Sequence, residues 1–207
     1  EDVTANYIVT KTPGELHITT AEIASYVALE TKDTEGTYKG EAYEAKAATV
    51  TAIGTGSVEG LTVEYSLTGA QNGDDWVTDP TTITRTDAGT TTVYVRVSGS
   101  NYDGYVTGTQ KIEVSQRPIT ITGDGWTADQ AYTGTEYRKD TYNPEEANQE
   151  NNRGLVAGQK VDGITYLLSG TEAGQYTGVF TGDVKILSGE EDVTANYIVT
   201  KTPGELH

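Results

Sequence analysis

The sequence predicts an all-β protein that is organised as two small tandem modules. Glycine and tyrosine are abundant, with 24 and 14 residues, and threonine occurs in runs. Threonine and tyrosine suit the half-buried surface of a strand, and glycine supplies turns. A hydrophobic fraction of 35% predicts small cores, and a sequence repeat described below divides the chain into modules.

Individual strands are predicted from side chains that alternate between two faces. In residues 90–99, Val93, Val95 and Val97 are expected to point into the core, and the residues between them toward solvent. The same alternation predicts strands at residues 61–67, 118–122, 163–168 and 184–187. Turn dipeptides such as Asp103-Gly104 separate the strands. Short strands with this spacing predict an immunoglobulin-like sandwich, which we prefer, with a β-grasp arrangement as the alternative.

Three stretches are less regular. Residues 17–20 read as a short strand, and residues 21–32 lack the apolar stripe of a helix, so we predict a strand there in preference to a short helix. Residues 143–154 are polar and aperiodic, which predicts a loop with room for one helical turn after Pro144.

The first seventeen residues recur without substitution at residues 191–207. Glu1 corresponds to Glu191 and His17 to His207, so the period is 190 residues. We interpret residues 1–17 as the terminal strands of a preceding repeat. Both copies would fit the same groove, and we expect residues 191–207 to occupy it because they are directly attached. Residues 1–17 would then fray, or make an end-to-end contact with a neighbouring molecule.

The period divides into two related modules. Asn-Tyr pairs at residues 6–7, 101–102 and 196–197 are 95 residues apart. Two further markers recur: Tyr-x-Gly-x-x-Tyr at residues 38–43 and 132–137, and Asp/Glu-Ala-Gly at residues 87–89 and 172–174. The offset of the last marker places about ten additional residues near residues 188–195. We predict modules at residues 18–115 and 116–207, each with its own core, and framework roles for Tyr38, Tyr43, Tyr132 and Tyr137.

These segments resemble repeats of bacterial surface adhesins. The string DVTANYIVTKTPGELHIT, with AGQYTG before it, resembles the closing strands of MBG-type repeats. Residues 87–114, DAGTTTVYVRVSGSNYDGYVTGTQKIEV, resemble the companion YDG-type repeat, and Tyr102-Asp103-Gly104 matches its name. The resemblance covers nearly all of the chain and implies a YDG-type module at 18–115 and an MBG-type module at 116–207. It also implies a long, exported cell-surface protein, and it supplies no catalytic residue.

Composition argues against several classes of function. A formal charge of −17 opposes binding to nucleic acid or an anionic membrane, since both need a basic face. No run of about 18 apolar residues is present to predict membrane insertion. His17 and His207 occupy one repeat position, so a catalytic triad or a two-histidine metal site is not expected. Paired carboxylates remain the only enzymatic option, and we expect no catalysis.

Two short segments are candidate binding sites. In the sequence NGDDW, Asp74 and Asp75 place oxygen ligands beside the indole of Trp76, which suits Ca²⁺ or the stacking of a sugar ring. The segment lacks the spaced aspartates of a calcium loop, so an exposed turn is the simpler prediction and no cofactor other than Ca²⁺ is considered. Trp126 is a second sugar-stacking candidate, although a tryptophan at the start of a strand is more often a core residue.

The sequence therefore predicts a non-enzymatic tandem-repeat module that serves as a stalk or spacer in a large bacterial surface protein. The alternative is an adhesin module that binds host glycans or surface proteins. Neighbouring repeats of the same chain are the expected partners, and the isolated chain is expected to be a monomer outside the cell.

Overall fold

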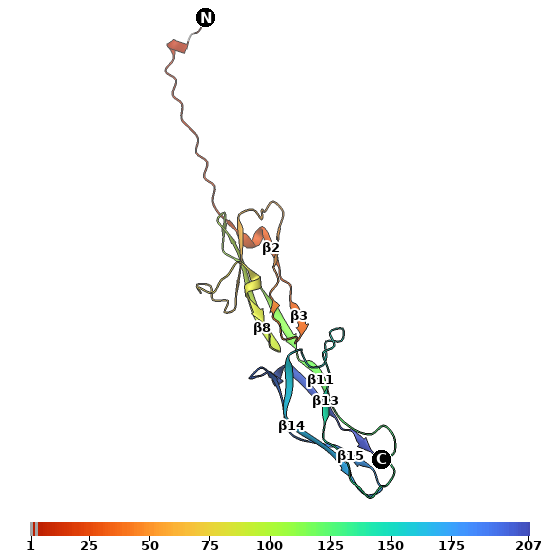
Figure 1. Ribbon diagram of the computed structural model, residues 1–207. Helices are drawn as coiled ribbons and strands as arrows, with labels where there is room; N and C mark the ends of the chain where they lie inside the picture. The colour runs from red at the N-terminus through yellow and green to blue at the C-terminus, as the bar shows by residue number, and fades with distance from the viewer. Residues whose placement is uncertain (1, 3) are drawn as a thin grey trace.

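Strands account for nearly all of the regular structure. The computed structural model describes residue 2 and residues 4–207, and within them it contains nineteen β-strands and four 3-10 turns but no α-helix. This confirms the predicted all-β class. Figure 1 shows two groups of strands placed end to end, with the chain termini at opposite ends of an elongated molecule. Residues 7–20 lead into the first group as a single extended thread.

The first module is built around a four-stranded sheet. Its order is β3-β10-β8-β6, with bounds Thr34–Thr37, Val106–Ser115, Gly89–Gly99 and Leu61–Ser66. Three short pairs complete it: β1 (Ala21–Glu22) with β9 (Tyr102–Asp103), β2 (Val27–Glu30) with β5 (Thr49–Ala52), and β4 (Tyr43–Glu44) with β7 (Thr84–Arg85). The 3-10 turns of this half of the chain are η1 (Thr4–Asn6), η2 (Ile23–Ser25) and η3 (Pro80–Thr82).

The second module is a sandwich of two facing sheets. One has the order β13-β11-β18, with bounds Tyr142–Pro144, Arg117–Gly123 and Tyr197–Thr202. The other has the order β12-β14-β16-β17, with bounds Tyr137–Lys139, Gln159–Gly170, Val179–Ser188 and Glu191–Asp192. β15 (Tyr176–Thr177) pairs with β19 (Glu205–Leu206), and η4 spans Thr194–Asn196. The rings of Tyr142 and Phe180, one from each sheet, lie 6.2 Å apart between centroids.

The alternating segments form strands as predicted. Val93, Val95 and Val97 of β8 are buried, whereas Tyr94 faces solvent. Of the less regular stretches, residues 21–32 contain the short strands β1 and β2, so the strand prediction holds for Ala21–Glu22 and Val27–Glu30 and is wrong for the 3-10 turn between them and for residues 31–32. Residues 17–20 lie outside any strand, which corrects the prediction of a strand there, because no neighbouring strand is available to pair with them.

The predicted loop at residues 143–154 is ordered by backbone hydrogen bonds. Asn148 and Arg153 exchange backbone hydrogen bonds of 2.8 and 3.1 Å around a turn, so a small hairpin stands where a helical turn after Pro144 had been considered. Asn152 closes this turn with φ of 51°, a left-handed conformation that asparagine tolerates. The hairpin packs against the module junction through the carbonyl groups described below.

In each module, one early strand pairs in parallel with a strand near the end of the module. In the first module, β3 pairs with β10 in parallel, with Ile112 opposite Thr34. In the second module, β11 pairs with β18 in parallel over six residues, from Arg117 opposite Tyr197 to Thr122 opposite Thr202. Because parallel strands point the same way, the chain enters a module at one end and leaves it at the other. This topology makes an end-to-end arrangement the natural one.

The two modules keep separate sheets but share a core. Among the described residues, no sheet takes strands from both sides of Gln116. One apolar cluster nevertheless runs through the junction and includes Tyr38 from the first module and Val193 and Tyr197 from the second. Each module also buries a cluster of its own, which is Ile23, Val27 and Val97 in the first and Tyr166, Leu168 and Leu206 in the second. The expectation of separate cores therefore holds away from the junction and is wrong where the junction cluster spans both modules. The cluster is continuous because β10 passes into β11 with one intervening residue, which leaves no room for a solvated linker.

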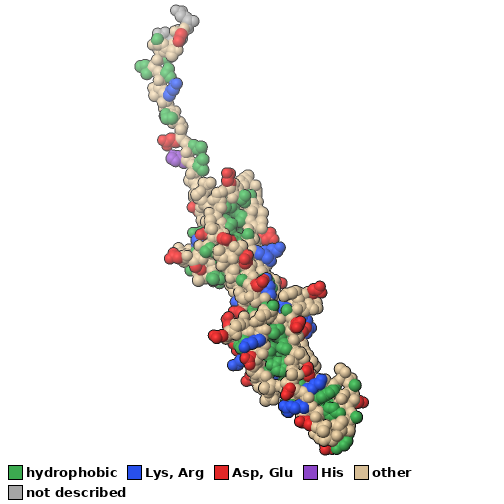
Figure 2. Space-filling view, in the orientation of Figure 1, with side chains coloured by type: hydrophobic (Ala, Val, Ile, Leu, Met, Phe, Trp, Pro, Cys, Tyr) green, Lys and Arg blue, Asp and Glu red, His purple; other side chains and the backbone are tan. Residues whose placement is uncertain are grey.

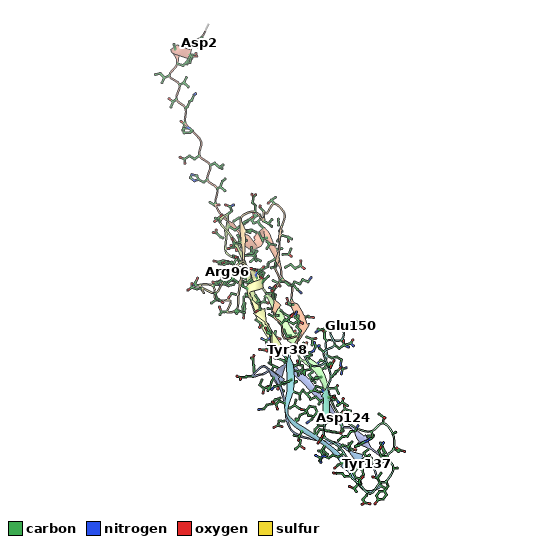
Figure 3. The ribbon with its side chains drawn as sticks, in the orientation of Figure 1. Asp2, Tyr38, Arg96, Asp124, Tyr137 and Glu150 are labelled. Atoms are coloured by element: carbon green, nitrogen blue, oxygen red, sulfur yellow. The ribbon has the colours of Figure 1, made fainter. Side chains whose placement is uncertain are left out.

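Two tyrosine rings pack together at the junction, and hydrogen bonds link their hydroxyl groups. Tyr38 and Tyr197 meet edge to face, with ring centroids 5.4 Å apart. The amide group of Gln159 joins their hydroxyl groups: its Nε2 donates to Tyr38 at 2.9 Å, and its Oε1 accepts from Tyr197 at 2.5 Å. Burial raises the pKa of the Tyr197 phenol. Figure 3 places Tyr38 at the waist between the modules.

The four recurring tyrosines do not share one role. Tyr38 is buried, and the hydroxyl groups of Tyr43 and Tyr137 donate to the carbonyl oxygens of Thr37 and Ala131. Tyr132, the counterpart of Tyr38, is 65% exposed near the far end of the second module. The framework prediction is wrong for Tyr132, because Tyr38 is covered by the neighbouring module and no module covers Tyr132.

A buried arginine closes the junction. Arg117 is fully buried, and its guanidinium group donates to four backbone carbonyl oxygens. These belong to Gly154 at 2.7 Å, Arg153 at 2.7 Å, Asn148 at 3.2 Å and Tyr38 at 3.3 Å. Only Tyr38 lies in the first module, so one side chain ties the end of β3 to the hairpin of the second module. The planar fork of arginine suits such divergent acceptors better than the single ammonium group of lysine.

Substitution of Arg117 by methionine is expected to lower the free energy of unfolding by about 3 kcal/mol, because four hydrogen bonds are lost and the buried carbonyl oxygens of Gly154 and Tyr38 are left without this donor. Urea unfolding followed by circular dichroism would measure the change. Lys111→Met is the matched control, since it removes the same charge from an exposed position on β10 and should cost at most about 0.5 kcal/mol. Equal effects of the two substitutions would contradict the role assigned to Arg117.

Candidate functional site

The segment that contains Asp75 and Trp76 folds over the outer face of the first module. After β6 ends at Ser66, the chain turns back so that the Asp75 carboxylate accepts from the Ser66 hydroxyl at 2.6 Å and from the Thr68 backbone N–H at 3.1 Å. The hydrogen bond from Ser66 is the main reason that the pKa of Asp75 lies below its ordinary value. Asp75 therefore stabilises the folded-back conformation of this loop.

The indole of Trp76 is held against the sheet by two contacts. Its Nε1–H donates to the carbonyl oxygen of Ala70 at 2.7 Å. The guanidinium carbon of Arg96, on β8, lies 4.0 Å from the centre of the Trp76 ring and 5.1 Å from the centre of the Tyr105 ring. A cation between two aromatic faces is favourable because the ring quadrupoles are negative on their faces. Arg96 also pairs with Glu64 at 2.8 Å, which fixes its position.

A solvent-open groove of about 310 Å³ lies beside this cluster. Its walls include three aromatic residues, one arginine and two threonines: Trp76, Tyr94, Tyr105, Arg96, Thr107 and Thr109. Flat apolar faces beside hydroxyl and guanidinium donors match the alternating apolar and hydroxylated faces of a sugar ring. We call this feature the aromatic groove. Figure 3 labels Arg96 in the first module.

The other predicted site residues do not join the aromatic groove. Asp74 is exposed on the same turn as Asp75. Trp126 lies in the second module, where its ring meets Tyr137 edge to face at 5.9 Å between centroids and the Lys139 Nζ lies 4.8 Å from its ring centre. Of the four predicted residues, only Trp76 lines the groove. Trp126 packs against the apolar cluster of Tyr166, Leu168 and Leu206 in the other module.

Asp74 and Asp75 belong to no cluster of three metal-ligating side chains in the described part of the chain. Within residue 2 and residues 4–207, no three Asp, Glu, His or Cys side chains gather closely enough to hold a metal ion. One oxygen of Asp75 is already engaged by Ser66 and Thr68, so its carboxylate serves the loop.

Sequence reasoning missed Tyr94, Arg96 and Tyr105 as site residues. Tyr94 and Arg96 were predicted to face outward from their strand, which was the available signal. Their approach to Trp76 depends on how residues 67–75 fold back, and no local pattern encodes that path. The groove therefore exists only because of this tertiary contact.

A second feature is a set of side-chain hydrogen bonds around the rim of the module junction. Asn196 is buried, and its side chain crosses to the first module: Nδ2 donates to Asp87 at 2.8 Å, and Oδ1 accepts from the Ala88 backbone N–H at 2.7 Å. Gln116 Nε2 donates to the carbonyl oxygen of Ala195 at 2.8 Å. The additional residues predicted near 188–195 form β17 and lead into η4, so this insertion is what positions Asn196.

Comparisons with known proteins add little beyond the fold. No family model and no curated protein matches the sequence. Among solved structures, the chain is similar to three N-terminal domains of the highly immunogenic outer capsid protein (Hoc) of bacteriophage RB49, with 12% identity, a TM-score of 0.29, and coverage of 87% of this chain and 69% of that one. It is also similar to the endo-fucoidan hydrolase MfFcnA9 of glycoside hydrolase family 107, with 14% identity and a TM-score of 0.22.

The coverage of the hydrolase is 88% of this chain but only 34% of the enzyme, so the chain spans about a third of its length. Both TM-scores are too low to assign a function. Within the described residues, no helix has the length and apolar character needed to cross a membrane.

Asp75→Asn is expected to lower the melting temperature by a few degrees at pH 7, because the amide cannot accept from Ser66 and Thr68 as the carboxylate does. The folded-state pKa of Asp75 is lowered, so its contribution is complete above the unfolded pKa and is lost as the pH falls through the folded pKa. The difference between the wild type and the variant should therefore narrow below about pH 4. Asp74→Asn is the matched control and should change neither value. A difference that persists unchanged at low pH would contradict this assignment.

Proposed function

We propose that this protein is a non-enzymatic, tandem-repeat spacer of a long bacterial surface protein, in which rigidly joined modules extend a stalk. The observation that carries the proposal is the junction, where Tyr38, Arg117 and Tyr197 are buried in one core shared by two modules. Such a junction resists bending, because any hinge motion would expose apolar rings and leave the Arg117 hydrogen bonds unmade. The identical seventeen-residue segments at a spacing of 190 residues support an array of such units.

The fold also supports extension in one direction. Because an early strand and a late strand of each module are parallel, each added module lengthens the rod instead of folding back on it. Figure 2 shows acidic side chains distributed over the visible face of both modules. A net charge of −17 keeps neighbouring rods apart in solution. The resemblance to adhesin repeats is the reason for placing this rod outside the cell, with neighbouring repeats of the same chain as its partners.

The rigidity of the junction can be tested with Asn196→Ala, which leaves Asp87 and the Ala88 N–H without their partner. Spin labels at Thr92→Cys on β8 and Lys185→Cys on β16 would report the distance between the modules, and the chain contains no native cysteine that could compete. Wild type should give one narrow distance distribution, and Asn196→Ala a broader one.

Asn6→Ala is the matched control, because Asn6 is the same repeat position outside the junction. It should leave the distribution narrow. A broad distribution in the wild type would contradict the rigid-spacer proposal, since the modules would then swivel independently.

A second function, carbohydrate binding, is favoured by one specific observation. The aromatic groove presents Trp76, Tyr94 and Tyr105 around a solvent-open space on the side of the rod. A side-facing site leaves both module ends free for neighbouring repeats, so binding and spacing are compatible. The ligand class that the groove suits is a neutral or acidic sugar, since Arg96 is the cation beside it.

A glycan-array screen of the full chain tests this second function. We expect Trp76→Ala to weaken any glycan signal by about tenfold, which corresponds to the loss of about 1.4 kcal/mol of stacking. Trp126→Ala should leave the signal unchanged, because that ring packs in the other module. Absence of binding by the wild type, or an equal loss in both variants, would reject the aromatic groove as a glycan site.

A further inference from the structure

One ion pair crosses the sheet beside the aromatic groove. Arg96 of β8 lies opposite Glu64 of β6 on one side and opposite Thr107 of β10 on the other. The Arg96 Nε donates to the Glu64 carboxylate at 2.8 Å, and the two side chains are only 13% and 22% exposed. The pair is therefore largely shielded from the solvent that weakens ion pairs at exposed positions.

The guanidinium group of Arg96 is fixed in place but keeps one free donor. Its carbon lies 4.0 Å from the centre of the Trp76 ring, and Nη1 donates to the carbonyl oxygen of Gln71 at 2.8 Å. Nη2 has no acceptor among the described residues. Arg96 lines the groove, whereas Glu64 does not. A ligand in the groove can therefore accept from Arg96, while the carboxylate that balances the arginine lies outside the groove.

The charge of Arg96 is the only formal charge on the described residues that line the groove. Because Glu64 balances it, the groove offers an anion no uncompensated cation. The adjoining loop adds the exposed Asp74, and the whole chain has a formal charge of −17. Figure 2 shows acidic side chains on the visible face of both modules. An acidic ligand would lose hydration on entering the groove and would gain little electrostatic energy in return.

The other side-chain donors of the groove are mainly hydroxyl groups. Tyr94, Tyr105, Thr107 and Thr109 line the groove and are exposed, and their hydroxyl groups have no hydrogen-bond partner within the described part of the chain. A hydroxyl group both donates and accepts, as the hydroxyl groups of a sugar also do. The tyrosine rings and Trp76 add apolar faces against which a sugar ring can pack. The free groups of the groove thus match an uncharged sugar.

We propose that the aromatic groove selects uncharged glycans over acidic ones, and that Glu64 sets this preference by balancing the charge of Arg96. The inference rests on the carbohydrate-binding function proposed above, and it narrows the ligand class from neutral or acidic sugars to neutral ones. The selectivity arises from an unfavourable interaction with the wrong ligand, which is a common source of specificity. Glu64 acts through Arg96, since it does not line the groove itself.

An acidic sugar is disfavoured by a local effect and by a long-range effect. Locally, a ligand carboxylate at Nη2 would share one guanidinium group with Glu64, and two carboxylates beside one cation repel each other. At long range, the negative charge of the chain repels anions, but salt screens this repulsion beyond about 8 Å at physiological ionic strength. The local effect therefore dominates under those conditions, and a single substitution can remove it.

Glu64→Gln on a glycan array tests the inference. Glutamine keeps an oxygen that can accept from Arg96 Nε, so Arg96 stays in place while its charge becomes unbalanced. Wild type should bind uncharged glycans and give no signal above background with glycans that end in sialic or uronic acid. Glu64→Gln should retain the uncharged glycans and raise the signal of the acidic ones by about tenfold. Thermal melting would verify that the variant is folded.

Glu113→Gln is the matched control. Glu113 is exposed on the same face of β10, four residues beyond Thr109. Four residues of a strand span about 13 Å, which exceeds the screening length of about 8 Å, so this variant should select as the wild type does. A salt titration adds a readout that a merely structural role of Glu64 would not change. The acidic signal gained by Glu64→Gln should fall at about 0.5 M salt, and the uncharged signal should remain.

The outcomes separate this inference from the carbohydrate-binding function itself. If wild type binds acidic glycans as strongly as uncharged ones and Trp76→Ala weakens both, the groove is a carbohydrate site but the inference is wrong. An acidic signal that does not rise in Glu64→Gln, or that rises equally in Glu113→Gln, would also overturn the role of Glu64. If neither wild type nor Glu64→Gln binds any glycan, the carbohydrate-binding function fails and the inference fails with it.

Discussion

The burial of Arg117 between the modules is the constraint on which the rest of the structure depends. Its guanidinium group is surrounded by carbonyl oxygens from Tyr38 on one side and from the hairpin at residues 148–154 on the other. A cation removed from water must keep all of these acceptors, because each broken hydrogen bond would leave an unsatisfied group in the core. The positions of β3, β11 and the hairpin are therefore coupled through one side chain.

This coupling explains how the molecule combines separate sheets with a shared core. Strand pairing stays within each module, so each has its own pattern of backbone hydrogen bonds. The apolar cluster contains residues of both modules, since only one residue separates β10 from β11 and the module ends must touch. The insertion that forms β17 and η4 then supplies Asn196, which seals the rim of the contact by binding Asp87. We infer that the rigidity of the junction arises from apolar packing together with the hydrogen bonds at its rim.

Prediction from sequence succeeded where a pattern is local and failed where contacts are distant. Alternation identified the buried valines of β8 and the outward direction of Tyr94 and Arg96, and the NGDDW segment was correctly assigned to a turn. The aromatic groove was not predictable, because it forms only when Trp76 folds back onto β8. Tyr132 is a second example of a failed prediction. Its repeat position matches that of Tyr38, but the burial of the side chain depends on the presence of a neighbouring module.

The repeated segment shows which features depend on local sequence and which depend on tertiary structure. In both copies the Asp-Val-Thr sequence makes the same local contacts: the Thr4 and Thr194 N–H groups donate to Asp2 and Asp192 at 2.9 and 3.0 Å, and a 3-10 turn follows. These contacts span only a few residues, so the sequence alone determines them. The residues after the turn become β18 and β19 in one copy and stay extended in the other, because a strand needs hydrogen-bond partners and an apolar surface that only the tertiary structure provides.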